Sequence, residues 1–181
     1  MLKKFINYNI LLCCLFSCTG KITNNYNNEG NDFEKFDRDY SIGLNSQWVK
    51  DESFKIKQYC KRHGLVTKIT NSGLRYLIID SSKTNIKPKI GNDVILSYDV
   101  RLMDPFNTSC YHSDSNGLAK FRIEQSMVET GLHEVVTYLN KGDSALVILP
   151  HFLAHGVTGD SKKIPPLSSV LYYIKLVDVI N

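Results

Sequence analysis

The chain has 181 residues, of which 43% are hydrophobic and 22% are charged, with a formal net charge of +4. This composition excludes a disordered chain, and no apolar run reaches the ~18–20 residues of a membrane-spanning helix. The mild charge argues against a nucleic-acid binder, and five Cys without a CxxC pair exclude zinc-finger and redoxin sites.

The first eighteen residues have the pattern of a lipoprotein export signal. Lys3 and Lys4 precede a short apolar run, as in a secretory signal. The run ends in Leu15-Phe16-Ser17-Cys18, which is similar to a bacterial lipobox except that Phe16 replaces a small residue. We therefore expect residues 1–17 to be a signal peptide and Cys18 to be lipidated. The alternative is an ordinary signal followed by an unmodified thiol.

A polar segment follows the predicted lipidation site. Five Asn lie between positions 24 and 31, and large apolar side chains are scarce there. Such a segment buries too little surface to order itself, so residues 18–46 are predicted to be a flexible tether. Lipid chains on Cys18 would anchor the protein in the bacterial cell envelope. The lack of an acidic run after Cys18 favours the periplasmic face over the cell surface, and we expect the outer membrane to hold the anchor.

Residues 47–63 have the pattern of an amphipathic helix. The apolar residues Val49, Ile56, Tyr59 and Cys60 recur near helical spacing, and Gly64 is suited to end the helix. We assign residues 47–72 to an N-terminal helical extension. Its charged face is predicted to be solvated, and a partner-binding role is the alternative.

Beyond this helix the apolar pattern changes to a period of two. Strands are predicted at 74–80, 94–102, 119–125, 145–149 and 170–180. One helix interrupts them, with Leu132, Val135, Val136 and Leu139 on one face. Ser126 with Glu129 is typical of a capping box, and Lys141-Gly142 is expected to end the helix. The predicted fold class is α+β, an antiparallel β-sheet wrapped around one short α-helix and preceded by an amphipathic helix.

Several short motifs follow one another in a characteristic order along residues 73–181. They are Ile90-Gly91-Asn92-Asp93-Val94, Tyr98, Gly131-Leu132-His133-Glu134, Lys141-Gly142-Asp143, Ile148-Leu149-Pro150, Leu153-Ala154-His155-Gly156 and Ile164-Pro165-Pro166. This order and its spacings resemble the FK506-binding type (FKBP) of peptidyl-prolyl cis-trans isomerase. Together with the lipobox and the upstream helix, the segment 154–165 resembles the lipoprotein branch of the family, including gliding-motility-associated lipoproteins.

The resemblance implies a proline-binding pocket with catalytic and substrate-binding side chains. Its walls would include Tyr98, Tyr111 and Tyr172, and Ile164 would come from the Ile-Pro loop. Leu132 stands where the family has a tryptophan at the pocket floor.

Four further positions enter through the same resemblance. Val128-Glu129 replaces a Val-Ile pair whose second backbone N–H holds the substrate carbonyl, and a shift of one residue would give this role to Val128. His112 follows Tyr111 where many members have aspartate, and His155 stands where many have a tyrosine. A solvated His155 is the alternative.

The implied activity is prolyl isomerisation that assists the folding of exported proteins. The expected partners are proline-containing polypeptides and, through the lipid, a membrane; no nucleic acid, metal or cofactor is expected. His151 and His155 have no carboxylate or thiolate nearby in the sequence, which argues against a metal site. The alternatives are a catalytically weak chaperone or binding module, or a structural domain of an envelope or motility assembly. Cys60 and Cys110 are predicted to stay unpaired, the second in a loop.

Overall fold

The computed structural model describes the backbone of residues 26–180 and the side chains of residues 41–180. The chain divides into two units, residues 1–41 and residues 42–181. The predicted signal peptide and Cys18 lie outside the described residues, so their assignment remains a prediction. Within the part described, no helix is both long and apolar enough to cross a membrane.

The N-terminal helix is longer than the apolar pattern predicts. Helix α1 spans Tyr26–Arg62, so residues 26–46 are helical where a flexible tether was expected. That expectation depended on the lack of apolar side chains, but polar residues also form helices when no glycine or proline cluster interrupts them. The predicted end is confirmed, because α1 ends at Arg62 and Gly64 follows with a φ of 62°.

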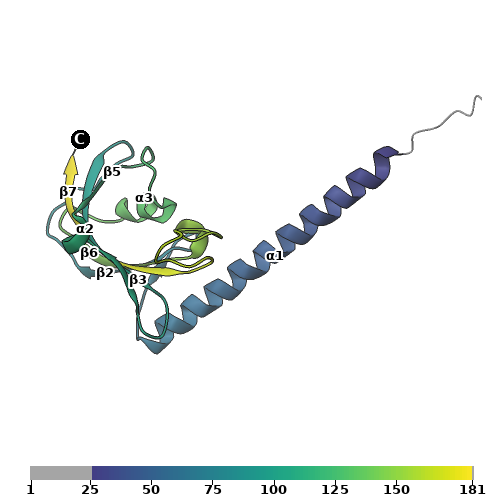
Figure 1. Cartoon of the computed structure of the whole chain (residues 1–181). Helices are drawn as coiled ribbons and strands as arrows, with labels where there is room; N and C mark the ends of the chain where they lie inside the picture. The colour runs from purple at the N-terminus through teal and green to yellow at the C-terminus, as the bar shows by residue number, and fades with distance from the viewer. Residues whose placement is uncertain (1–25, 181) are drawn as a thin grey trace, which may run out of the picture. The chain divides into compact units, whose positions relative to one another are not determined.

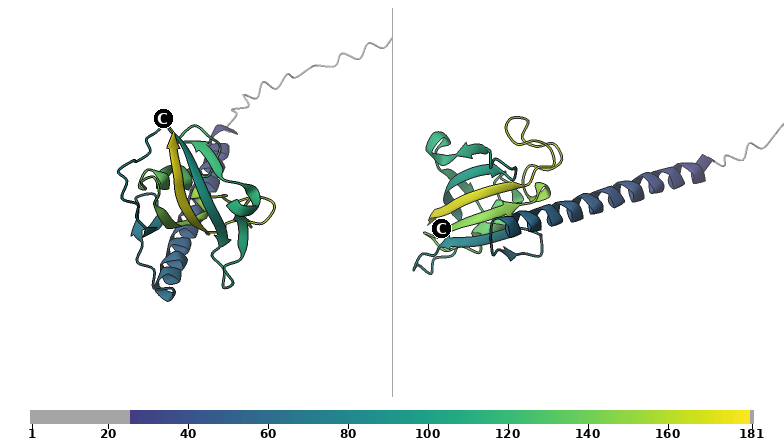
Figure 2. Two further views of the ribbon diagram at one scale, coloured as in Figure 1. Left: turned by 90° about the vertical axis from the view of Figure 1, so that its left-hand side faces the viewer. Right: turned by 90° about the horizontal axis from the view of Figure 1, so that it is seen from below.

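Seven strands form one antiparallel sheet, which confirms the predicted fold class. Their bounds are β1 Lys68–Ile69, β2 Arg75–Asp80, β3 Asp93–Leu102, β4 Ser109–His112, β5 Ala119–Arg122, β6 Ser144–Leu149 and β7 Val170–Ile180. The order is β1-β2-β6-β7-β3-β4, and β5 also pairs with β3. Strand β7, yellow in Figure 2, therefore runs through the middle of the sheet beside β3. Strands β1 and β4 are short, and the period-two pattern did not predict them.

Helix α3 (Thr130–Val136) is the helix predicted inside the sheet, and it lies within the curve of the strands (Figure 1). Its predicted apolar face is buried, but the predicted ends are wrong. Glu129 is the N-cap without a side-chain cap, and Ser126 Oγ instead accepts from the Arg122 backbone N–H at 2.9 Å. After Val136, backbone N–H groups bond to carbonyls three residues earlier, and the last of these bonds comes from Leu139. The helical turn therefore ends before Gly142.

Two short helical segments complete the fold. Helix α2 spans Ser113–Asn116, and the 3-10 helix η1 spans His151–Leu153.

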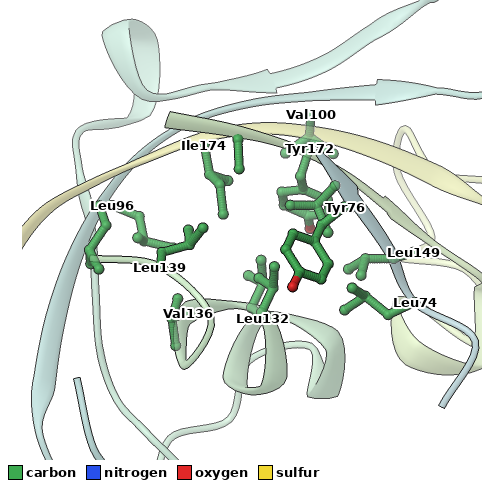
Figure 3. Close-up of a cluster of buried hydrophobic side chains, with 14 of the residues drawn as sticks. Leu74, Tyr76, Leu96, Val100, Leu132, Val136, Leu139, Leu149, Tyr172 and Ile174 are labelled. Carbon is green, nitrogen blue, oxygen red and sulfur yellow. The ribbon is translucent and has the colours of Figure 1, made fainter. Parts of the chain in front are cut away.

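The sheet buries side chains on both faces. On β6, Val147 and Leu149 face the cluster around α3, whereas Leu146 and Ile148 face Ile56 of α1. Figure 3 shows the first cluster, in which Leu132 of α3 points toward the strands. Helix coverage of both faces explains why nearly every residue of β6 is buried.

The two described cysteines are both free, in agreement with the prediction that they stay unpaired, and both are buried. Cys60 belongs to the cluster beneath α1, and Cys110 belongs to the cluster around α3. Cys110 lies on strand β4 rather than in the expected loop.

Candidate active site

Gly131 lets the start of α3 approach strand β6 closely. A Cβ atom at this position would lie 2.5 Å from Leu149 Cδ2 and 3.0 Å from the backbone oxygen of Leu153. A larger residue would therefore push α3 away from the sheet. The close approach holds the next residue, Leu132, against a cavity between α3 and the sheet.

This cavity has a volume of about 380 Å³. Most of the site residues predicted from the sequence line it, and they come from the sheet, the start of α3 and the loop after η1. They are Tyr98, Tyr111, Val128, Glu129, Leu132, His155 and Tyr172. The fold thus gathers side chains that lie far apart in the sequence around one space.

Two predicted site residues do not line the cavity. Ile164 is 2% exposed and belongs to the core, where its backbone N–H donates to Asp160 at 2.8 Å and closes the loop. His112 caps α2, since its Nδ1 accepts from the Asp114 backbone N–H at 3.0 Å. Ile164 therefore packs in the core, and His112 lies outside the cavity.

Sequence reasoning missed several residues that line the cavity. They are Leu96, Val100, Asn116, Ala119, Phe121, Asp160, Lys162 and Ile174. A usable signal existed for the strand residues, because Leu96 and Val100 share the face of Tyr98 on β3. The polar residues gave no such signal.

Two polar side chains meet Glu129 at the cavity. The hydroxyl of Tyr172 donates to Glu129 Oε1 at 2.7 Å, and His155 Nε2 lies 3.2 Å from the same oxygen. The His155 nitrogen is buried and forms no hydrogen bond to a described residue. Burial, followed by the charge of Glu129, raises the pKa of Tyr172 well above its ordinary value. The tyrosine therefore stays protonated and acts as a donor.

Asp160 fixes the loop between η1 and β7, which contributes to the lining of the cavity. Its carboxylate accepts hydrogen bonds from the Tyr111 hydroxyl and from the backbone N–H groups of Lys162, Lys163 and Ile164. Burial alone would raise the pKa of Asp160, but these hydrogen bonds lower it far below the ordinary value. The hydrogen bond to Asp160, followed by burial, raises the pKa of Tyr111 to about 12. The pair holds one wall of the cavity in place.

The two histidines that raised the question of a metal site have different environments. His151 pairs with Glu52 at 2.6 Å, whereas His155 faces Glu129. Within the described part of the chain, no three His, Cys, Asp or Glu side chains gather as metal ligands. The cavity instead offers an apolar surface with few polar groups, which suits a cyclic aliphatic side chain and its flanking amides.

The comparison with solved structures supports the fold. FkpA from Escherichia coli matches with a TM-score of 0.60 and 24% sequence identity, over 83% of this chain and 71% of that chain. The comparison with protein families matches the part of the chain that forms the cavity. Residues 84–177, more than half of the chain, match the FKBP-type peptidyl-prolyl cis-trans isomerase family. Strands β3 to β6, helix α3 and every residue that lines the cavity lie within this span, and the chain belongs to the FKBP-type peptidyl-prolyl cis-trans isomerase family.

Proposed function

We propose that this isomerase acts from a lipid anchor at the outer membrane, facing the periplasm, on proline-containing segments of exported proteins. The observation that carries the catalytic part is the cavity in which Tyr98, Leu132 and Tyr172 meet. Membership of the family supports prolyl isomerisation as the reaction. The lipobox supports the anchor and the lipoprotein branch.

The reaction requires no nucleophile and no metal. Rotation about an X–Pro bond has a barrier of ~18–20 kcal/mol because the amide loses its resonance. A site accelerates the rotation when it binds the twisted amide more tightly than the planar one. The cavity would exclude water around the proline ring, and the Glu129 backbone N–H, at the start of α3, would hold a substrate carbonyl.

The catalytic proposal is tested by measuring exchange of a prolyl peptide by NMR. Tyr98→Ala and Tyr172→Ala each remove aromatic surface from the cavity, so we expect the catalysed rate to fall roughly tenfold. Tyr173→Ala is the matched control, because Tyr173 neighbours Tyr172 on β7 but does not line this cavity. If the wild-type protein does not exceed the buffer rate, the catalytic proposal fails.

The anchor is tested with a second pair of variants. Cys18→Ala should abolish acylation and release the protein from the membrane fraction, whereas Cys14→Ala should leave both unchanged. Mass spectrometry of the mature protein supplies the readout. Membrane association and mass that do not change in Cys18→Ala would overturn the anchor.

A second candidate function is a binding module or chaperone with weak catalysis. It is favoured by Leu132, which offers less surface to a proline ring than an aromatic side chain, and by the carboxylate of Glu129 in the cavity. A protein that suppresses aggregation of an unfolded client but does not accelerate prolyl exchange would favour this alternative.

A further inference from the structure

The cavity of the isomerase contains the carboxylate of Glu129, and among the described residues its ion-pair partner is His155, which carries a charge only when it is protonated. Glu129 lines a space formed mostly by aromatic and aliphatic side chains, and its own side chain is 19% exposed. A carboxylate in such a setting is costly unless it is paired or hydrogen-bonded. Its partners therefore indicate what the cavity prefers to bind.

The two oxygens of Glu129 differ in their contacts. Oε1 accepts from Tyr172, and His155 lies beside the same atom. Residues 41–180 provide no hydrogen bond to Oε2. An ionised carboxylate accepts about four hydrogen bonds, so most of the capacity of Glu129 is unused.

Apart from His155, the charged groups around the cavity do not pair with this carboxylate in the described structure. The carboxylate of Asp160 accepts hydrogen bonds from Tyr111 and from three backbone N–H groups, so its hydrogen-bond partners come from Tyr111 and its own loop and not from Glu129. Lys162 is exposed and forms no ion pair with Glu129 in the described structure. Tyr172 remains a protonated neutral donor, so it supplies a hydrogen bond to Glu129 but no positive charge.

We infer that Glu129 makes this isomerase favour prolyl segments with lysine or arginine next to the proline. The inference rests on the proposed catalytic function of the same cavity. A cationic side chain beside the proline would reach Oε2, in a partly buried setting where charge pairs are stronger than in water. An acidic side chain at the same place would be repelled, which sharpens the choice.

The test compares peptides that differ only in the residue next to the proline. Lys, Ala and Glu are placed before the proline in one series and after it in a second series. In at least one series we expect kcat/KM to follow the order Lys, Ala, Glu, with roughly tenfold between the extremes. High salt should reduce this difference, because it screens the charges.

Two variants of the full-length protein separate a direct contact from a general charge effect. Glu129→Gln keeps an oxygen for Tyr172 but removes the charge, so the ratio of Lys to Glu peptides should fall to within about twofold. Glu124→Gln removes an equal charge from an exposed residue that does not line the cavity, and the ratio should persist. Ratios within one variant are compared, so a change in overall rate does not affect the result.

The outcomes distinguish the inference from the function on which it rests. Catalysis of the Ala peptide with equal rates for Lys and Glu peptides overturns the charge preference and leaves the isomerase intact. If no peptide is isomerised, the proposed function fails, and binding of the same peptides by NMR shift changes gives the charge comparison. Equal affinities would then overturn the inference as well, as would a preference that survives in Glu129→Gln.

Discussion

Leu132 occupies the cavity at the position where the family resemblance places a tryptophan. It is 6% exposed, points from α3 toward the strands (Figure 3) and lines the cavity. A larger aromatic side chain therefore has room to extend toward a bound proline without displacing the core.

We expect Leu132→Trp to raise kcat/KM for a prolyl peptide by roughly three- to tenfold, because stacking on an aromatic ring adds favourable contact in the bound state. NMR exchange of the peptide measures the rate, and the thermal unfolding midpoint reports whether the variant folds. A folded variant with an unchanged or lower rate would contradict the expected role of this position.

At the residue scale, seven of the nine site residues that the family resemblance implied line the cavity, and the strand period also supports two of them. Tyr98 and Tyr172 satisfy both criteria, and both line the cavity. Ile164 satisfied only the resemblance, because an apolar residue beside proline serves a loop core equally well. Asp160 was missed as a cavity residue, since an aspartate among lysines in a loop has the pattern of a solvated residue.

The loop between η1 and β7 illustrates how one residue organises an element. Gly159 has a φ of 67°, and a Cβ there would lie 2.2 Å from the oxygen of Ile164. The Asp160 backbone N–H donates to this same oxygen at 3.1 Å, while its carboxylate gathers the N–H groups that follow. The loop is therefore a compact turn built around Asp160, and Asp160 and Lys162 of this turn line the cavity.

We expect Asp160→Asn to lower the free energy of unfolding by about 1–2 kcal/mol near pH 7. The amide of Asn is uncharged, so the hydrogen bonds that the Asp160 carboxylate accepts from Tyr111 and the backbone would become weaker. The folded-state pKa of Asp160 lies below its unfolded value. Its contribution is therefore fully present above the unfolded pKa of ~3.9 and is lost as the pH falls toward the folded pKa.

Urea unfolding at several pH values measures this effect. The difference between the wild-type protein and Asp160→Asn should narrow as the pH decreases from about 5 to about 2. Asp114→Asn is the control, since its side chain is 87% exposed and should show little difference at any pH. A wild-type advantage that stays constant over this range would exclude the carboxylate as its source.

At the scale of elements, the long strands and α3 were predictable because their apolar period is sustained. Strand β1 contains only Lys68 and Ile69, which is too short for any period to appear. The start of α1 was missed for the opposite reason, because a helix of polar residues has no apolar period. Hydrophobic patterning therefore predicts the long elements of the core, and it misses short strands such as β4, although Cys110 of β4 is buried in that core.

For the second unit as a whole, helix coverage of both sheet faces is the organising feature. The part of α1 after Ile42 belongs to this unit, and Ile56, Tyr59 and Cys60 pack on Leu146, Ile148 and Leu171. The sequence predicted the amphipathic helix but not its partner. Only the pairing of β6 with β7 shows that these alternate residues form a second apolar face.

A buried polar cluster also ties α1 to the sheet. The carboxylate of Glu52 accepts from the backbone N–H of His151 at 2.7 Å and from the Ser169 hydroxyl at 2.5 Å. It also lies 2.6 Å from His151 Nδ1, and all three residues are less than 9% exposed. Loss of the carboxylate would leave these groups buried without partners.

We expect Glu52→Ala to destabilise the protein by about 3 kcal/mol, with Glu52→Gln affected less because it retains an oxygen for Ser169 and His151. Asp51→Ala, an exposed neighbour on the same helix, should change stability little.

Trp48 is the single tryptophan of the chain and lines the cavity of about 420 Å³ beside Glu52, so its fluorescence reports docking of α1. In Glu52→Ala its emission should shift at a lower urea concentration than the far-ultraviolet circular dichroism of the sheet. Coincident transitions at the wild-type midpoint would show that this cluster does not hold the helix in place.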